Sequence, residues 1–351
     1  MSRYLRSSYQ PLTAYVPGEQ PRDLAYIKLN TNESPYPPAP QVVAAVNAGQ
    51  IELLRLYSDP TCMGLKQKLA AQTGLLPENI FISNGSDDAL NFVFMAYSEL
   101  GATFADITYG FYPIYANLHA APTRVIPLED DFSLDPGQYQ DCKGLIVIAN
   151  PNAPTGLSIS VDAIEGILRD NPDAVVAIDE AYVDFGGDSA LPLLEKYDNL
   201  LVIRTFSKSR CFAGGRLGYI VGNAALIADL EKLRCSTNPF NIDRLALVMG
   251  EATVDADSYY VEKCQEICRA RDKTAAALRQ LGLRVLPSKT NFLFVHAGAV
   301  GGERMYLELK KRAILVRHFP SARTKDYIRV TIGTPAQMEV FVAAVEEILK
   351  Q

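Results

Sequence analysis

Apolar segments alternate with stretches of helical spacing along the first two thirds of the chain. Continuous apolar runs that contain β-branched residues occupy positions 79–83, 144–149, 174–178 and 200–203. Runs of this length are typical of strands that are buried on both faces of a sheet. Apolar strands that alternate with helices predict an α/β fold with a mostly parallel central sheet and helices on both of its faces.

The pattern changes beyond Asn241. A long helical region is predicted first, at residues 245–281. Strands alternating with helices follow it, and we expect these elements at 283–288, 290–297, 304–312, 314–319, 327–333 and 335–349. Strands and helices mixed in this way predict a smaller α+β domain at residues 241–351, after a large domain at residues 41–240.

The first forty residues form a third kind of segment. Their prolines exclude a regular helix near the end of this segment, at Pro35, Pro37, Pro38 and Pro40. The segment nevertheless contains several aromatic and apolar residues, which free tails rarely have. The sequence therefore predicts an extended N-terminal arm, residues 1–40, that crosses a protein surface.

Composition narrows the range of partners. The chain has 351 residues, a formal charge of −6 and a pI near 5.3, whereas nucleic-acid binding usually requires a basic face. It has no apolar run long enough for a membrane span and no signal-like N-terminus, so we expect a cytoplasmic protein with no membrane partner. Six scattered cysteines and three histidines give no metal-ligand spacing, so we expect no metal site.

Polar side chains follow three of the apolar runs. Asn152 follows the second run, Asp179 and Tyr182 follow the third, and Lys208 follows the fourth. The carboxyl ends of parallel strands meet at one edge of a sheet, where ligands bind. We therefore expect these four side chains in one crevice. Considered one at a time, three of them also have an ordinary structural explanation: Asp179 as a helix cap, Tyr182 as a core aromatic and Lys208 as a surface charge.

A possible anion site follows the first apolar run. Asn84, Gly85 and Ser86 form a turn of small residues, and Asp87 opens a predicted helix. Free amide groups and the positive end of the helix dipole meet at such a point and bind phosphate, although many such turns only cap a helix. Tyr109 follows the next predicted strand, and its ring is either part of the core or a surface for stacking on a flat ligand.

These groups match the needs of pyridoxal phosphate. A lysine bonds to this cofactor, a carboxylate pairs with its ring nitrogen, and an asparagine and a tyrosine hydrogen-bond its phenolic oxygen. At this point the sequence resembles a known family. The segments NPNAPTG, DEAYVDF and RTFSKSRCFAGGRLGY are similar to those of fold-type I, class-II pyridoxal-phosphate aminotransferases. Together with LNTNESPYPP, YVPGE, YSDP, NGSDD, TNFLFV, LVRHF and YIRVTIGT they resemble the histidinol-phosphate aminotransferases.

The resemblance implies roles for individual residues and covers nearly the whole chain. It implies that Lys208, Asp179 and Tyr182 are catalytic. The residues that it implies for the cofactor are Lys208, Asp179, Asn152, Tyr182, Tyr109, Ser207, Arg216 and the amides of Ser86 and Asp87, with Tyr57 from the other subunit of a homodimer. The arm is then expected to pack on the small domain or on the dimer partner.

Small anionic substrates are expected to meet arginines. The fork of Arg329 suits a carboxylate, and by resemblance it binds the α-carboxylate of glutamate. Arg317 and Arg323 are candidates for a substrate phosphate, with a solvated loop charge as the alternative for Arg323. Tyr15 and Asn32 on the arm resemble substrate contacts.

Three local departures from the family pattern are present. Ala153 replaces a second asparagine, Ser58 replaces a proline, and residues 209–212 replace a more apolar segment. Within that segment Arg210 adds a charge beside Lys208, so we expect it to influence substrate choice. No departure removes a residue that the chemistry needs.

The resemblance implies exchange of an amino group between histidinol phosphate with 2-oxoglutarate and imidazole-acetol phosphate with glutamate, a step of histidine biosynthesis. The alternatives are a threonine-phosphate decarboxylase, an aromatic-amino-acid aminotransferase and a cofactor-binding regulator. The regulator would need a DNA-binding domain, and the short, proline-rich arm does not supply one.

Overall fold

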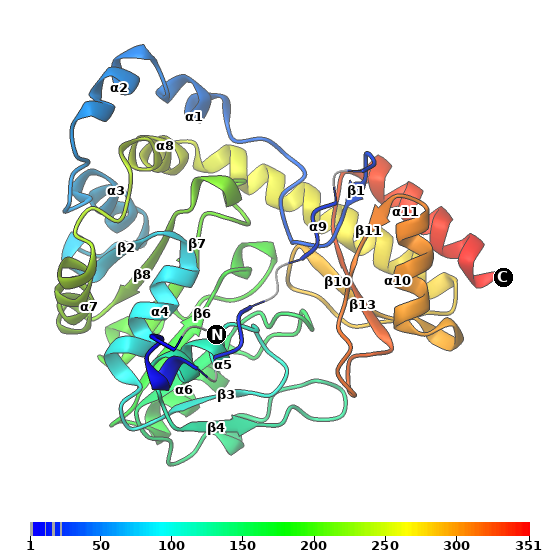
Figure 1. The fold of residues 1–351 in the computed structure, drawn as a ribbon, viewed down its shortest axis with the longest axis horizontal. Coiled ribbons are helices and arrows are strands. Elements are labelled where there is room, and N and C mark those ends of the chain that lie inside the picture. Colours follow the sequence, from blue (N-terminus) through cyan, green and yellow to red (C-terminus); the bar gives the residue numbers. More distant parts are fainter. Residues whose placement is uncertain (1–2, 11, 16–17, 22) are drawn as a thin grey trace.

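The molecule has two lobes joined by a long helix (Figure 1). The structure is a computed structural model that describes residues 3–10, 12–15, 18–21 and 23–351. Two positions of the YVPGE segment, Val16 and Pro17, lie outside the described residues. No helix in the described part of the chain is long and apolar enough to cross a membrane.

The larger lobe is built on a seven-stranded sheet with the strand order β2-β8-β7-β6-β5-β3-β4. Neighbouring strands from β7 to β4 pair in parallel, and β8 pairs antiparallel with both β7 and β2. The strands are β2 (Ile80–Ser83), β3 (Ala102–Ala105), β4 (Thr123–Ile126), β5 (Leu145–Ala149), β6 (Val175–Asp179), β7 (Leu200–Thr205) and β8 (Gly218–Gly222). The predicted α/β fold with a mostly parallel central sheet is therefore confirmed.

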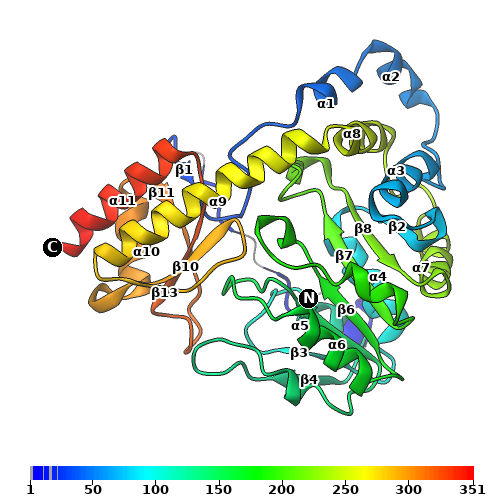
Figure 2. The same ribbon diagram turned by 180° about the vertical axis from the view of Figure 1, so that it is seen from behind.

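Helices cover both faces of this sheet (Figures 1 and 2). Alternate residues of one strand enter different cores: Leu200 and Val202 join one apolar cluster, while Leu201 and Ile203 join the other. This explains why the strands are apolar at every position. The first cluster includes residues of α3 (Met63–Thr73), α6 (Val161–Asp170) and α8 (Arg244–Asp255), and the second includes residues of α4 (Gly85–Tyr97), α5 (Tyr112–Leu118) and α7 (Ala224–Thr237).

The smaller lobe contains a four-stranded antiparallel sheet with the order β12-β13-β10-β9. The N-terminal arm joins this lobe, because β1 pairs in parallel with β11. The elements are β1 (Ile27–Lys28), α9 (Asp257–Gln280), β9 (Arg284–Val285), β10 (Phe292–His296), α10 (Gly302–Lys311), β11 (Ile314–Leu315), β12 (Arg317–His318), β13 (Tyr327–Thr331) and α11 (Pro335–Leu349).

The change from one lobe to the other occurs inside α9. The single helical region predicted at 245–281 is two helices, with Ala256 between α8 and α9. Helix α8 packs on the large-lobe helices, so residues 242–256 belong to the core of that lobe. Within α9, Tyr260 joins the large-lobe core and Cys264 joins the small-lobe core. The packing thus changes about twenty residues later than the boundary expected at residue 241.

Short elements complete the chain. After the arm, α1 (Pro40–Ala45) and α2 (Ala48–Glu52) lie on the side of the large lobe that carries α8 (Figure 1). The 3₁₀ turns are Ser7–Tyr9, Leu53–Arg55, Pro77–Asn79, Pro136–Gln138, Val183–Phe185, Leu191–Glu195, Ala213–Gly215 and Gly298–Val300.

Candidate active site

A cavity of about 320 Å³ opens where the carboxyl ends of β5, β6 and β7 meet. A cavity of this size is within the usual range for small ligands. Arm residues Thr31 and Glu33 close one side of it. The predicted residues that line it are Ser86, Asp87, Tyr109, Asp179, Tyr182, Ser207, Lys208 and Arg216. The parallel sheet therefore brings together residues that are up to 130 positions apart, from 86 to 216.

Lys208 lies in the loop after β7. Thr205 ends the strand, and its hydroxyl accepts a hydrogen bond from the amide of Ser207 at 3.1 Å, which fixes the start of the loop. The half-buried lysine Nζ is 3.5 Å from the carbonyl oxygen of Thr31 and 5.9 Å from the centre of the Tyr182 ring. No carboxylate of the described residues forms an ion pair with Nζ. The amine is therefore available to a ligand in the cavity.

Asp179 is the last residue of β6 and is 4% exposed. Its carboxylate accepts hydrogen bonds from the hydroxyl of Tyr112 at 2.9 Å and from the amide of Ala181 at 3.2 Å. The pKa of Asp179 is raised to about 6, chiefly by burial and also by the negative charges of Asp87 and Glu180, while the hydrogen bonds from Tyr112 and Ala181 oppose the rise. A buried carboxylate of this kind is stabilised by a cation, and no cationic side chain of the described residues pairs with it.

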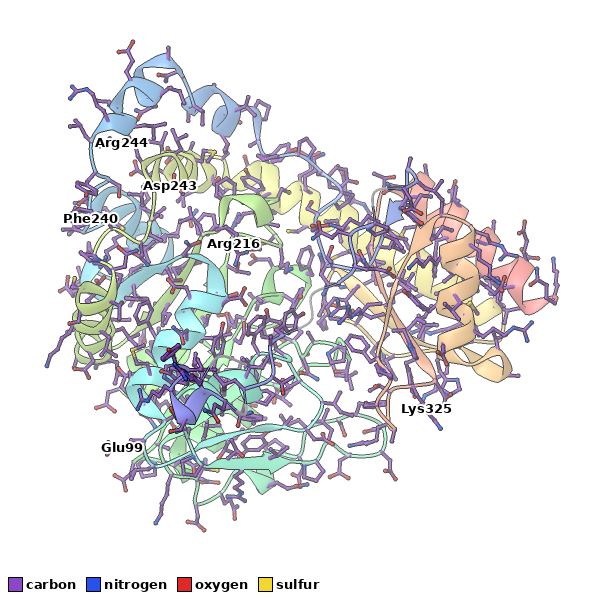
Figure 3. The ribbon with its side chains drawn as sticks, viewed as in Figure 1. Glu99, Arg216, Phe240, Asp243, Arg244 and Lys325 are labelled. Carbon is purple, nitrogen blue, oxygen red and sulfur yellow. The ribbon has the colours of Figure 1, made fainter. Side chains whose placement is uncertain are left out.

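The opposite end of the cavity is built around the N-terminus of α4. Arg216 Nη2 lies 3.1 Å from Asp87 Oδ2, and the Tyr109 hydroxyl donates to Asp87 Oδ1 at 2.6 Å. Gly85 has a φ of 79°, and a Cβ at this position would lie 2.7 Å from Arg216 Nη2. Arg216 is labelled in Figure 3 on the inner side of the large lobe. A guanidinium beside free helix amides is an anion site.

We predict that Gly218→Ala weakens this anion site. A Cβ on Gly218 would lie 2.6 Å from the carbonyl carbon of Gly85 and 2.7 Å from the amide nitrogen of Ser86, so the turn at the start of α4 must move. We expect affinity for pyridoxal phosphate to fall at least tenfold, about 1.4 kcal/mol, in a spectroscopic titration of the apoprotein. The control is Gly166→Ala in α6, where a Cβ would lie 3.8 Å from Arg169 Nη2, an ordinary van der Waals contact. Equal affinities for the two variants would contradict the prediction.

Asn152 does not line the cavity with the other predicted residues, and its expected contact with the phenolic oxygen stays a prediction. Its side-chain amide donates to the carbonyl oxygen of Ile107 and to the hydroxyl of Thr155, both at 3.0 Å. These bonds close the turn after β5 and turn the amide toward a neighbouring cavity of about 460 Å³. Ala153 lines the site cavity instead. The asparagine is therefore used to build the turn.

Arg329 and Arg317 are directly opposite each other on β13 and β12. The guanidinium of Arg329 donates to the carbonyl oxygen of Asn30 at 3.1 Å, and its Nε is buried without a hydrogen-bond partner. Burial lowers the pKa of Arg329, and the tyrosines 15, 109 and 182 partly offset this effect. A buried guanidinium that forms no ion pair with a described residue is prepared for an anionic ligand.

Arg323 does not line the cavity, and its role as a candidate for a substrate phosphate stays a prediction. Its guanidinium forms an ion pair with Asp106 at 2.9 Å and donates to the carbonyl oxygen of Glu129 at 2.6 Å. It also lies 5.5 Å from the centre of the Phe132 ring. The residue thus joins the loop before β13 to the large lobe.

The two arm residues differ in their positions. Tyr15 stacks on Phe111 at 4.3 Å between ring centres, next to the loop that carries Tyr109. Asn32 is 2% exposed, and its side chain is bonded to Tyr182 and Thr331. Asn32 does not line the cavity, and its expected substrate contact stays a prediction.

Tyr57 is 78% exposed and does not line the cavity of its own chain. Its ring stacks on Phe240 at 4.5 Å, and its carbonyl oxygen accepts from Arg244 at 2.9 Å. Figure 3 shows Phe240 and Arg244 at the edge of the large lobe that faces away from the small lobe. Ser58, the departure from proline, donates to the carbonyl oxygen of Ile242 at 2.6 Å.

Arg210 also lies away from the cavity. It forms an ion pair with Asp257 in the first turn of α9, at 2.5 Å, and its guanidinium lies 5.8 Å from the centre of the Tyr260 ring. The charge beside Lys208 therefore fixes the lysine loop to the helix that joins the lobes. The expected influence of Arg210 on substrate choice stays a prediction.

Sequence reasoning did not single out Tyr112, the residue that holds Asp179. Tyr112 is fully buried, and Asp179 and burial both raise its pKa well above the usual value. It is the first residue of α5 and comes three positions after Tyr109, so the aromatic segment 109–112 was the signal that could have found it. Thr31, Glu33 and Ala181 were also missed among the lining residues.

Known proteins resemble this chain over its full length. A family model for aminotransferase class I and II matches residues 25–345. The chain is 47% identical over 352 residues to a histidinol-phosphate aminotransferase of Marinomonas sp. (strain MWYL1) and 44% identical over 349 residues to one of Clostridium acetobutylicum, with 99% of each chain covered. A crystal structure of histidinol-phosphate aminotransferase from Sinorhizobium meliloti in complex with pyridoxal-5'-phosphate has a TM-score of 0.86 at 26% identity, with 99% of both chains covered.

Proposed function

The chain belongs to the class I and II aminotransferase family, and on that basis we propose that it is a pyridoxal-phosphate-dependent histidinol-phosphate aminotransferase. It interconverts histidinol phosphate and 2-oxoglutarate with imidazole-acetol phosphate and glutamate, as a step of histidine biosynthesis. The observation that carries the proposal is the placement of Lys208 and Asp179 on one cavity whose far end is an anion site. Relatives with this name at 47% and 44% identity support the choice of substrate.

The residues of the cavity fit pyridoxal phosphate. Asp179 is a buried carboxylate without a cationic partner, which suits a protonated ring nitrogen. Arg216, Ser207 and the amides of Ser86 and Asp87 suit the phosphate group. The ring of Tyr109, between these two ends, suits stacking on a flat aromatic ring.

When bound, pyridoxal phosphate supplies an aldehyde that takes up an amino group and a ring that accepts electrons. Lys208 would supply the amine that bonds to this aldehyde. When free, the same amine at Nζ would accept the proton of the donor Cα. Asp179 keeps the proton on the ring nitrogen, because its carboxylate stabilises that positive charge. Tyr112 holds the carboxylate in place for this task.

Arginines of the small lobe are proposed to bind the substrates. Arg329 binds the α-carboxylate of glutamate, since its fork presents parallel N–H groups to such an anion. Arg317, opposite it, binds the phosphate of histidinol phosphate. The rings of Phe292 and Phe319 lie 5.3 Å and 5.5 Å from the Arg329 guanidinium and limit its movement. Tyr15, which stacks on Phe111 beside the loop that carries Tyr109, is a further proposed substrate contact.

The test compares amino donors in the first half-reaction of the purified holoenzyme, followed through the visible absorption of the cofactor. We expect histidinol phosphate to react with a higher kcat/KM than threonine phosphate, phenylalanine or tyrosine. Release of CO2 from threonine phosphate would identify a decarboxylase instead. A preference for phenylalanine or tyrosine would identify an aromatic-amino-acid aminotransferase.

We also propose that two copies form a homodimer with shared active sites, which act in the cytoplasm. Large apolar side chains are exposed on one edge of the large lobe, at Val43, Ile51, Leu54, Leu56, Tyr57, Met63 and Phe240. Such a cluster marks an association surface, and a second copy of the chain is the occupant that brings Tyr57 to a partner cavity.

Mixed dimers test this proposal. Alone, Lys208→Ala protein lacks the reactive amine, and Tyr57→Phe protein is expected to bind the cofactor phosphate about tenfold more weakly, through loss of a hydrogen bond to a charged group. A mixed dimer contains one chain of each variant. If the sites are shared, the cavity of the Tyr57→Phe chain combines its own Lys208 with the intact Tyr57 of the Lys208→Ala chain. The mixed dimer should therefore have one site of wild-type cofactor affinity. If every site in the mixed dimer that retains Lys208 has the affinity of Tyr57→Phe, the sites are not shared.

A further inference from the structure

The side chain of Asn32 fixes the direction of the Tyr182 hydroxyl. Its Nδ2 group donates to the tyrosine hydroxyl at 2.8 Å, and both residues are buried. An amide NH₂ group can only donate, so the hydroxyl must accept this bond. The single hydroxyl hydrogen of Tyr182 then points elsewhere, and it has no hydrogen-bond acceptor among the described residues. Tyr182 lines the cavity, so the cavity is the direction left.

Thr331 determines which end of the Asn32 amide faces the tyrosine. The threonine hydroxyl accepts the backbone N–H of Asn32 at 2.9 Å and donates its own proton to Asn32 Oδ1 at 3.0 Å. With Oδ1 used in this way, Nδ2 is the end that reaches Tyr182. The backbone carbonyl of Asn32 is held as well, by the amide of Asn291 at 3.1 Å.

The backbone at Asn32 supports the same arrangement. Its φ of 55° is in the left-handed region, which asparagine tolerates better than most residues. The arm after β1 crosses from the small lobe toward the large lobe at this point (Figure 1). The chain of bonds thus runs from β13 through the arm to a tyrosine of the large lobe.

We propose that Asn32 is a positioning residue that makes Tyr182 the hydrogen-bond donor to the phenolic oxygen of the cofactor. This rests on the proposed function. The side-chain amide of Asn152 donates to the carbonyl oxygen of Ile107 and to the hydroxyl of Thr155, and Ala153, which lines this cavity, carries no donor. Tyr182 is then the neutral side-chain donor at this point, and its direction determines whether the bond forms.

The bond has a measurable electrostatic effect. A donor to the phenolic oxygen reduces the negative charge that the nitrogen of Lys208 experiences once it is bonded to the cofactor. Loss of the donor therefore raises the pKa of that nitrogen. The charged groups that face Tyr182 are Lys208 from the β7 loop, Asp179 from β6 and Arg329 from β13, and none of them is altered in the variants below.

The experiment measures the pH midpoint of the visible absorption change of the purified holoenzyme. Asn32→Gly removes the amide and keeps the positive φ without strain. We expect its midpoint to rise by about half to one pH unit, the equivalent of one neutral hydrogen bond, and Tyr182→Phe to raise it at least as much. In the Tyr182→Phe background, Asn32→Gly should cause no further rise, because the residue acts through the hydroxyl.

Two further variants separate this role from support of the arm. Asn30 is as buried as Asn32, but its side-chain amide donates to the carbonyl oxygen of Glu19 within the arm, so Asn30→Ala should leave the midpoint unchanged. Asn32→Asp keeps the size of the side chain, replaces the donor with an acceptor and should also raise the midpoint, which covers the case in which the glycine variant does not fold.

The outcomes are distinguishable. A wild-type protein without a visible band would overturn the proposed function and this role with it. A wild-type band together with an unmoved midpoint in Asn32→Gly and Asn32→Asp would overturn the role of Asn32 alone. An equal rise in the presence and absence of the Tyr182 hydroxyl would also overturn it, because Asn32 would then act by another route.

Discussion

Replacing Lys208 with alanine should reduce kcat for amino transfer by about 10⁵-fold or more, since one side chain serves as both the reactive amine and the proton carrier. The cavity offers no substitute among the described residues. Tyr109 and Tyr182 lack a basic nitrogen, and Arg216 is occupied by Asp87 and remains protonated. The variant should still bind pyridoxal phosphate, because the anion site is intact, but without the visible absorption of the lysine-bonded form.

The measurement combines single-turnover kinetics with the absorption spectrum of each variant. Lys208→Arg keeps the charge and loses the reactive amine, so it should be as inactive as the alanine variant. Lys325→Ala is the matched control, because this lysine is exposed on the loop before β13, at the lower edge of the small lobe in Figure 3, and does not line the cavity, so both quantities should be unchanged. Added ethylamine should restore part of the activity of Lys208→Ala. Wild-type turnover by Lys208→Ala would exclude the mechanism.

The fold could be predicted from the sequence because each strand and helix has a local pattern of apolar and polar residues. The apolar runs predicted at 144–149, 174–178 and 200–203 are the strands β5, β6 and β7, and the helix predicted from Pro335 to Leu349 has the same ends in the structure. The boundary between the lobes was not accessible in this way. It depends on which core the residues around Tyr260 enter, and the helical spacing of α9 is the same on both sides of that point.

The sequence predicted which residues lie near the site, but it did not predict which way their side chains point. Strand ends brought Asp179 and Lys208 to one cavity as predicted. Asn152 also follows a strand, yet its amide bonds Ile107 and Thr155 and points away. Whether a side chain at a turn faces the ligand depends on the local backbone, and the residue type does not determine it.

The arginines show that contacts between residues far apart in the sequence are also hard to predict. Arg329 was assigned from the fork of its guanidinium and from the family resemblance, and it lies on the strand β13. Arg323 and Arg210 lie in loops, and their partners Asp106 and Asp257 are more than 40 positions away in the sequence. The charge of an arginine in the sequence does not show whether its guanidinium is unpaired in the fold or forms an ion pair with a carboxylate of the same chain.

Asp179→Asn should lower kcat/KM by about a thousandfold, because a protonated ring nitrogen would lose its buried carboxylate partner, and such losses cost about 3–5 kcal/mol. Asparagine keeps the size of the side chain and a bond to Tyr112, so the change is one of charge. Asp255→Asn is the control, since this carboxylate is exposed and pairs with Lys68 outside the site. Equal kcat/KM for the two variants would remove Asp179 from the mechanism.

The same substitution should stabilise the apoprotein. The folded pKa of Asp179 is raised from 3.8 to about 6, so its contribution to stability is fully present below pH 4 and is lost as the pH rises through about 6. Above that pH the buried charge costs up to roughly 3 kcal/mol, and an amide removes this cost. In urea unfolding without cofactor, Asp179→Asn should exceed the wild type in stability at pH 8, and the difference should shrink at pH 5. With pyridoxal phosphate present the order should reverse, because the carboxylate then has its cation. A pH-independent difference, or the same order with and without the cofactor, would show that the carboxylate is not held for the ring nitrogen.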